Sequence, residues 1–152
     1  MIERIVDRSN WSKGEWDNEP QNRIDFIHAG FACFMLRGPM GSWCGYVGVP
    51  KGHPAYEKDY AALECEDNLD VHGGITYANK CQGAICHIPQ EGMPDDVWWL
   101  GFDTAHYQDK TPFNYGSIGL NYEPTGVYRN IAYMTAEIKR LADQLASMKG
   151  KD

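Results

Sequence analysis

The sequence lacks basic runs, long apolar runs and a signal peptide, which are typical of several large functional classes. Among its 152 residues no run of lysine and arginine occurs, and the formal net charge is −7. Nucleic-acid backbones require a basic patch, so a nucleic-acid partner is not expected. No apolar run approaches the length of a membrane span, and residues 1–16 lack the apolar core of a signal peptide. These absences predict a cytoplasmic protein with neither a nucleic-acid nor a membrane partner.

Strong metal signatures are missing as well. The chain contains no CxxC pairs and no HExxH motif. Its five cysteines are Cys33, Cys44, Cys65, Cys81 and Cys86. An odd number of cysteines without an export signal predicts reduced thiols in a cytosol. A metal knuckle at Cys81, Cys86 and His87 is disfavoured by the four-residue gap and the missing second pair. No cofactor is therefore predicted, and a divalent metal such as zinc is the alternative.

What the sequence does contain is typical of one globular domain spanning residues 1–152. Hydrophobic residues make up 43% and aromatic residues 12% of the chain, which is on the high side for aromatics. Sixteen glycines and eight prolines predict many turns and few long helices. Residues 1–22 are expected to be largely irregular, with a short strand or turn at 2–6.

Several short apolar segments bounded by glycine and proline predict strands of an antiparallel sheet. They are residues 30–36, 43–49, 71–78 and 97–103, with a further short strand at 84–88. The turn at 37–42 contains glycine and proline, so the first two segments are expected to form a hairpin. A short helix is predicted at 55–63. The sheet is expected to hold about four or five strands.

The C-terminal segment predicts a long amphipathic helix at 127–149, which completes an α+β fold. Seven apolar residues recur at alternating spacings of four and three: Val127, Ile131, Met134, Ile138, Leu141, Leu145 and Met148. Thr125 is the predicted N-cap. These seven apolar residues form a stripe along one side of the helix, and the stripe is longer than is needed to cover a small sheet. Two interpretations remain open. The helix packs across its own sheet, or part of it pairs with a second subunit and makes a homodimer.

Candidate functional residues lie at the ends of three predicted strands, each beside a glycine. His53 follows the segment 43–49, His72 opens the segment 71–78, and Asp103 with His106 closes 97–103. The last of these segments continues to Asp109, which adds another carboxylate. If the strand ends share one edge of the sheet, these side chains converge in one site. The competing interpretation is local: each histidine bonds to backbone in its turn, and Asp103 caps the turn after it.

Convergence would allow three kinds of chemistry. Histidine and aspartate bind divalent metals, and they also act as general acids and bases near neutral pH. Together with glycine-flanked N–H groups they suit a phosphate, while aromatic rings suit a nucleobase. For a nucleotide-like ligand the predicted polar contacts are His53, His72, Thr76, Asp103 and His106. Tyr46, Tyr56 or Trp99 would stack on the base.

Four sequence segments, taken together, resemble a group of small proteins encoded by phages and prophages. They are WCGYVGVPKGHPAY, VHGGITYA, WWLGFDTAHYQD and YRNIAYMTAEIKRLADQL, and they span roughly residues 43–149. The resemblance implies a small cytosolic accessory protein made during infection. Many such proteins counter host defence, either by sequestering a nucleotide second messenger as an oligomeric sponge or by destroying it.

The sequence and this resemblance lead to a ligand-binding function without catalysis. The expected ligand is a small anionic, nucleotide-derived signalling molecule of host defence, held by a sponge-like homo-oligomer formed through the C-terminal helix. The alternative is a small hydrolase, metal-dependent or His/Asp-based, that acts on a phosphodiester or an amide. In it His72, Asp103 and His106 hold the metal or act as base and orienter. A third interpretation is a phage factor that binds another protein.

Overall fold

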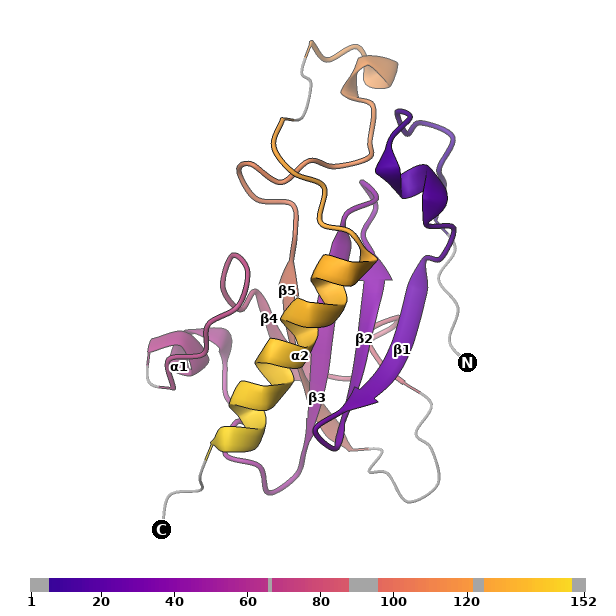
Figure 1. Cartoon of the computed structure of the whole chain (residues 1–152). Helices are drawn as coiled ribbons and strands as arrows, with labels where there is room; N and C mark the ends of the chain where they lie inside the picture. Colours follow the sequence, from indigo (N-terminus) through magenta and orange to yellow (C-terminus); the bar gives the residue numbers. More distant parts are fainter. Residues whose placement is uncertain (1–5, 66, 88–95, 122–124, 149–152) are drawn as a thin grey trace.

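The computed structural model describes residues 6–65, 67–87, 96–121 and 125–148, which form one antiparallel sheet crossed by a long helix (Figure 1). The five strands lie in the order β1-β2-β3-β5-β4, and every neighbouring pair is antiparallel. They are β1 (Arg23–His28), β2 (Phe31–Arg37), β3 (Trp43–Pro50), β4 (Tyr77–Lys80) and β5 (Val97–Asp103). The helices are α1 (Tyr60–Cys65) and α2 (Ile131–Ser147), with 3-10 turns η1 (Glu15–Asn18) and η2 (Tyr115–Ile118). The predicted α+β class is confirmed.

Two consecutive hairpins build the β1-β2-β3 side of the sheet. Ala29 and Gly30 join β1 to β2 with φ values of 55° and 83°, as a two-residue turn of type I′ requires. β2 pairs with β3, which confirms the predicted hairpin. The sequence analysis misses β1 as a separate strand, because its polar residues interrupt the apolar pattern that continues into β2.

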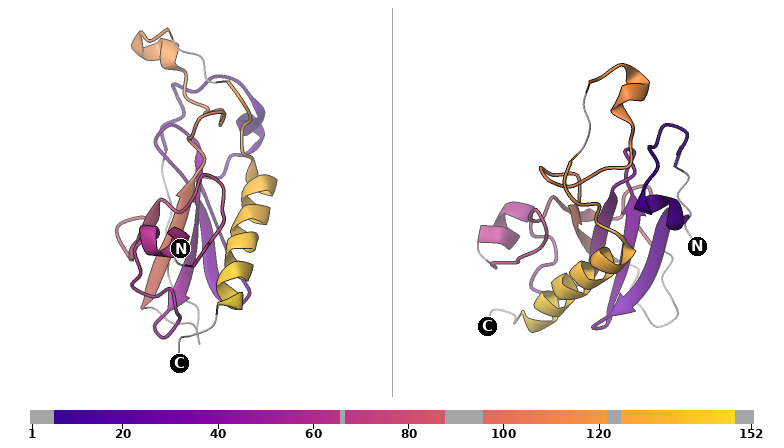
Figure 2. Two further views of the ribbon diagram at one scale, coloured as in Figure 1. Left: turned by 90° about the vertical axis from the view of Figure 1, so that its left-hand side faces the viewer. Right: turned by 45° about the horizontal axis from the view of Figure 1, so that its top comes forward.

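The helix α2 lies diagonally across one face of the sheet (Figure 1; Figure 2, left). Its core residues Met134, Ile138, Leu141 and Leu145 are completely buried. Gly45 of β3 permits this close packing, since a Cβ there would lie 2.7 Å from a side-chain carbon of Ile138. The apolar stripe therefore packs on the chain's own sheet, which is the first of the two interpretations. A homodimer could not use these four residues without opening the core, so it would need another surface.

The start of α2 differs from the prediction, and the difference positions a functional residue. The helix begins at Ile131, and the N-cap is Asn130, whose side chain accepts a hydrogen bond from the Tyr133 N–H. The predicted start at 127 and the Thr125 cap are therefore wrong. Val127 instead pairs with the loop after β5, where its N–H donates to the Gln108 carbonyl at 2.9 Å. This extended chain brings residue 129 beside that loop.

The opposite face of the sheet carries a second apolar cluster, made of Phe34, Leu36, Tyr46, Val97 and Trp99. Segment 81–87 covers part of it, with Cys81, Ala84 and Ile85 packed against the cluster. Arg23 of β1 anchors this segment, because its guanidinium donates to the carbonyl oxygens of Ala84 and Cys86. The segment therefore reaches from β4, at one edge of the sheet, to β1 at the other.

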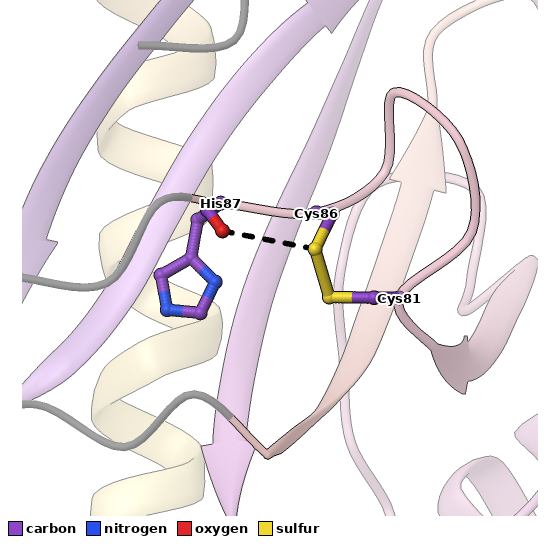
Figure 3. Close-up of side chains that lie close together, drawn as sticks. All are labelled: Cys81, Cys86 and His87. Atoms are coloured by element: carbon purple, nitrogen blue, oxygen red, sulfur yellow. Dashed lines mark hydrogen bonds between the residues drawn. A yellow bond between two sulfur atoms is a disulfide. The ribbon is translucent and has the colours of Figure 1, made fainter.

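Cys81 and Cys86 form a disulfide that closes this segment (Figure 3). Between them, Gln82 and Ile85 exchange two backbone hydrogen bonds of 2.9 and 3.0 Å. The cysteines are thus the next cross-strand pair, with Cα atoms 4.6 Å apart, close to the usual spacing of about 4.5 Å for a pair without backbone hydrogen bonds. The prediction of reduced thiols is wrong for these two residues, whereas Cys33 and Cys44 do not take part in a disulfide.

Some predicted elements are shifted or lie outside the described residues. The short helix is found at Tyr60–Cys65 and not at 55–63, and the strand expected at 71–78 is reduced to β4 at Tyr77–Lys80. Of the strand predicted at 84–88, only an isolated bridge between Gln82 and Ile85 is present in the described part. The prediction at 2–6 falls almost entirely outside the described residues.

Candidate functional site

The antiparallel topology decides which of the predicted residues meet. β4 runs antiparallel to β5, so the start of β4 lies beside the end of β5. His72 precedes β4, and Asp103 and His106 end or follow β5, so these three side chains come to the same end of the sheet. The imidazole rings of His72 and His106 lie 6.2 Å apart between centroids. The predicted convergence of these three residues is therefore present.

His72 is the centre of a chain of hydrogen bonds. Its Nε2 lies 2.8 Å from Oδ2 of Asp109, and its Nδ1 lies 2.6 Å from the hydroxyl of Tyr133 in α2. Its backbone N–H donates to the carboxylate of Glu137, also in α2, at 2.8 Å. In the neutral ring Nε2–H donates to Asp109, and Nδ1 accepts the Tyr133 proton. The helix and the loop after β5 thus fix the orientation of this imidazole.

Asp109 is the buried anion of the site, with a side chain only 1% exposed. Its Oδ1 accepts from Nε of Arg129 at 2.8 Å, whereas Oδ2, which contacts His72, also accepts from the backbone N–H of His106 at 3.1 Å. Burial by itself raises the pKa of the Asp109 carboxyl. The hydrogen bonds from His72, Arg129 and His106 oppose this effect and together hold the pKa below its ordinary value.

The lowered pKa of Asp109 predicts a loss of stability in acid. A carboxylate whose folded-state pKa is depressed contributes its full stabilisation above the unfolded pKa and loses it as the pH falls through the folded pKa. The free energy of unfolding should therefore decline below about pH 4, the ordinary range of an aspartate. Urea titrations of wild type and Asp109→Asn between neutral and acid pH test this. The decline should be shallower in the variant, and equal slopes would contradict the assignment.

Asp103 and His106 form a second, more accessible pair. Nε2 of His106 lies 3.0 Å from Oδ1 of Asp103, and both side chains are about one-third exposed. The His106 ring rests on Gly73, where a Cβ would lie 2.4 Å from its Cδ2 and Nε2 atoms. The absence of a side chain at residue 73 therefore allows the ring to approach His72.

Replacing Gly73 with alanine should displace His106 and disrupt the site. Gly73 has φ +69°, so the substitution adds backbone strain to the clash with the ring. Gly52→Ala is the matched control, because Gly52 also has a positive φ of +99° but nothing lies within 4 Å of its Cβ position. NMR spectra of the histidine rings should show altered His106 signals in Gly73→Ala and unchanged signals in Gly52→Ala. Equal spectra in both variants would contradict the contact.

His53 does not belong to this site. β3 and β5 are antiparallel, with Pro50 opposite Val97, so the chain leaving β3 emerges at the other end of the sheet from Asp103. The seven residues of β5 separate these ends by roughly 20 Å. Nε2 of His53 contacts the Leu145 carbonyl at 2.7 Å, and its Nδ1 accepts from the Ala55 N–H at 2.9 Å. The prediction that His53 converges with His72, Asp103 and His106 is therefore wrong, and its two contacts fix a turn.

The aromatic residues expected to stack on a base are placed elsewhere. Tyr46 and Trp99 are buried in the cluster on the face opposite α2, and Tyr46 stacks on Phe34 at 4.8 Å. Tyr56 bonds through its hydroxyl to Asp96, just before β5 begins. None of the three predicted stacking residues therefore faces His72 or His106. Tyr107, which the sequence analysis did not select, follows His106 directly and is 93% exposed.

Thr76 remains beside the site, at the end of the sheet where β4 meets β5. Its N–H donates to the Gly101 carbonyl at 2.9 Å, and its side chain is exposed.

The sequence analysis included Asp109 in the segment after β5 but did not assign it a role, and it missed Arg129 and Tyr133. The predicted helix at 127–149 contained both residues. Arg129 in fact precedes α2.

The hydrogen bonds of His72 favour proton exchange with Asp109 and Tyr133 over metal binding at this site. Both ring nitrogens of His72 are engaged by Asp109 and Tyr133, and Nε2 of His106, which makes no hydrogen bond to the described residues, lies 3.0 Å from Oδ1 of Asp103. In the part of the chain that the structure describes, the donors close enough to share one ion are those of Cys81, Cys86 and His87. A metal bound by His72, Asp103 and His106 would have to break the existing pairs.

The described helices include none that is both long and apolar enough to cross a bilayer. Comparison of the chain with known protein families, curated proteins and solved structures finds no match.

Proposed function

We propose that the chain is a binding protein that captures a small anionic, nucleotide-derived ligand and holds it without cleaving it. The observation that carries this proposal is the pairing of the His72 and His106 rings, 6.2 Å apart, at one end of the sheet. Arg129 adds a permanent positive charge beside them, with a side chain 23% exposed. The carboxylates of Asp103 and Asp109 lie at the same end of the sheet, so an anion is met here by directed hydrogen-bond donors and not by a net positive charge.

The hydrogen-bond chain lets the site respond to an anion. When His72 is protonated, its Nδ1–H donates to the Tyr133 oxygen, and the Tyr133 O–H is then released to donate elsewhere. Asp109 supports the imidazolium, since its carboxylate bonds to Nε2 at 2.8 Å. Burial, and next the charge of Glu137, raise the pKa of Tyr133, so this hydroxyl stays protonated as a donor. An arriving phosphate therefore finds donors on Tyr133 and Arg129.

Tyr107 is the aromatic residue best placed for a base. It adjoins His106, and its ring is the most exposed of the large apolar side chains in the described residues. Stacking of a base on an aromatic ring contributes about 1–3 kcal/mol. In this proposal Tyr107 takes the role that the sequence analysis assigned to Tyr46, Tyr56 or Trp99. Sequestration of a host-defence messenger in the cytoplasm, which the resemblance to phage proteins implies, is the biological form of this function.

Calorimetry against cyclic dinucleotides and ADP-ribose derivatives tests the proposal. Wild type should bind at least one of them with Kd below about 10 μM, a level weak even for small ligands. Tyr107→Ala should weaken nucleotide binding by the stacking contribution of about 1–3 kcal/mol, and His106→Ala should weaken it too. His53→Ala is a control outside the site and should bind as wild type does, after its fold is verified. No binding by wild type, or equal losses in all three variants, would overturn the proposal.

A second candidate is a hydrolase that uses general acid–base catalysis, and the chain Tyr133–His72–Asp109 favours it. An oriented imidazole between a buried carboxylate and a hydroxyl can accept and return a proton. The two functions differ in their product. Chromatography of the ligand after prolonged incubation should return it unchanged if the chain is a binding protein. Turnover that stops in His72→Ala would establish the hydrolase instead.

A further inference from the structure

We propose that reduction of the Cys81–Cys86 disulfide converts segment 81–87 into a binding site for one soft divalent metal ion, with zinc as the natural occupant. The two sulfur atoms and a ring nitrogen of His87 all lie within 4.8 Å of one another (Figure 3). This inference is independent of the proposed ligand capture, because the segment packs on the opposite face of the sheet from α2.

The spacing of the three donors suits zinc. In a tetrahedral site with the usual bond lengths of 2.0–2.3 Å, two donor atoms lie roughly 3.5–3.8 Å apart. The His87 nitrogen therefore needs to approach the sulfurs by about 1 Å, and the two sulfurs must separate to about 3.8 Å when their bond is broken. Thiolate and imidazole together select zinc over magnesium or calcium. Three protein ligands leave the fourth tetrahedral position for water.

The disulfide and the metal exclude each other, and the exchange between them has a defined chemistry. A dithiol reductant supplies two electrons and two protons, the S–S bond breaks, and the reductant becomes a disulfide. Cys81 and Cys86 are then thiols. Zinc binding displaces the two thiol protons to solvent, and both thiolates and the neutral His87 ring bind the ion. Reoxidation reverses the sequence and releases the metal.

The surroundings of segment 81–87 support both states. The Nε1–H of Trp99 lies 3.4 Å from Sγ of Cys81, where it can stabilise a thiolate. The His87 ring packs edge-on against Trp99, with centroids 5.0 Å apart. Arg23 holds the Ala84 and Cys86 carbonyls, so the segment stays on the sheet when the disulfide opens. Cys33 is a poor competitor, because burial raises the pKa of its thiol to about 12.

Titration of the full chain with Co²⁺, followed by competition with Zn²⁺, tests this inference. Protein kept reduced with a phosphine under anaerobic conditions should bind one ion and develop thiolate-to-cobalt charge-transfer absorption. Protein with the disulfide intact should show neither. His87→Ala should weaken binding at least tenfold, and Cys86→Ser should remove the absorption. Cys44→Ser is the matched control, since this thiol lies outside the donor group, and it should bind as wild type does.

Mapping of alkylated cysteines by mass spectrometry keeps the test independent of any variant that folds poorly. In reduced wild type, zinc should protect Cys81 and Cys86 from alkylation and leave Cys44 unprotected. The inference is overturned if zinc protects neither cysteine, or if oxidised and reduced protein bind the ion equally.

Discussion

Replacing Asp109 with alanine is expected to lower the free energy of unfolding by about 3–5 kcal/mol, as when one partner of a buried ion pair is removed. The carboxylate is 1% exposed and accepts hydrogen bonds from His72 and from Arg129, both at 2.8 Å. Its loss leaves these two groups without their shared acceptor, and it also removes the acceptor of the His106 N–H. Urea denaturation at neutral pH, followed by tryptophan fluorescence, measures the change.

Asp103→Ala is the matched control for this prediction. Asp103 also pairs with a histidine, at 3.0 Å, but its side chain is 33% exposed. An ion pair in contact with solvent contributes roughly 0–1 kcal/mol, so the control should lose no more than that. If the two variants are equally stable, Asp109 is not the buried anchor of the site.

Replacing Arg37 with methionine is expected to cost a similar amount, about 3–5 kcal/mol. Arg37 is completely buried, and its guanidinium lies 4.0 Å from the centroid of the Trp43 ring. It donates to the Tyr128 hydroxyl at 2.6 Å and to the Glu19 carbonyl at 3.0 Å. The Glu19 carboxylate in turn accepts the N–H of Ile131, the first residue of α2, at 2.8 Å. Methionine keeps the apolar volume but leaves these partners unsatisfied.

Arg140→Met separates this effect from the general loss of a positive charge. Arg140 bonds to Glu137 and Asp70, but its side chain is 45% exposed, so the expected cost is below about 1 kcal/mol. Arg37 also joins the segment before β1 to the residues before α2, because it bonds to Glu19 and to Tyr128, the neighbour of Arg129 in the chain. Arg37→Met should therefore weaken ligand binding as well as stability. Equal stability of the two arginine variants would contradict this role.

The sequence was sufficient to predict the regular elements whose pattern is local. Residues 97–103 alternate between two buried faces and form β5 at the predicted positions. The stripe of α2 is correct over its buried residues, but its first turn is not. Val127 fits the helical spacing, yet its backbone pairs with Gln108, a contact between distant segments that periodicity does not reveal. The disulfide was not predicted either, because it depends on backbone pairing that the sequence pattern does not show. The turn at Gln82–Ile85 places Cys81 and Cys86 opposite each other.

The candidate site was predicted in part, and strand direction explains the errors. His72 and Asp103 meet because one precedes a strand and the other ends its antiparallel neighbour. His53 follows β3, which is also antiparallel to β5, so it lies at the far end of the sheet. The assumption that the ends of consecutive strands share one edge is valid only for parallel strands. Asp109 and Tyr133 could not be ranked from the sequence, because their importance comes from contacts with His72.

The most direct measurement is two-dimensional NMR of the ¹⁵N-labelled histidine rings during titration with cyclic dinucleotides and cyclic ADP-ribose. The account predicts that the His72 and His106 signals shift in a saturable manner with one of these ligands, and that the His53 signals, locked between Leu145 and Ala55, do not move. Unchanged His72 and His106 signals with every ligand, or equal shifts of His53, would contradict a binding site at this end of the sheet.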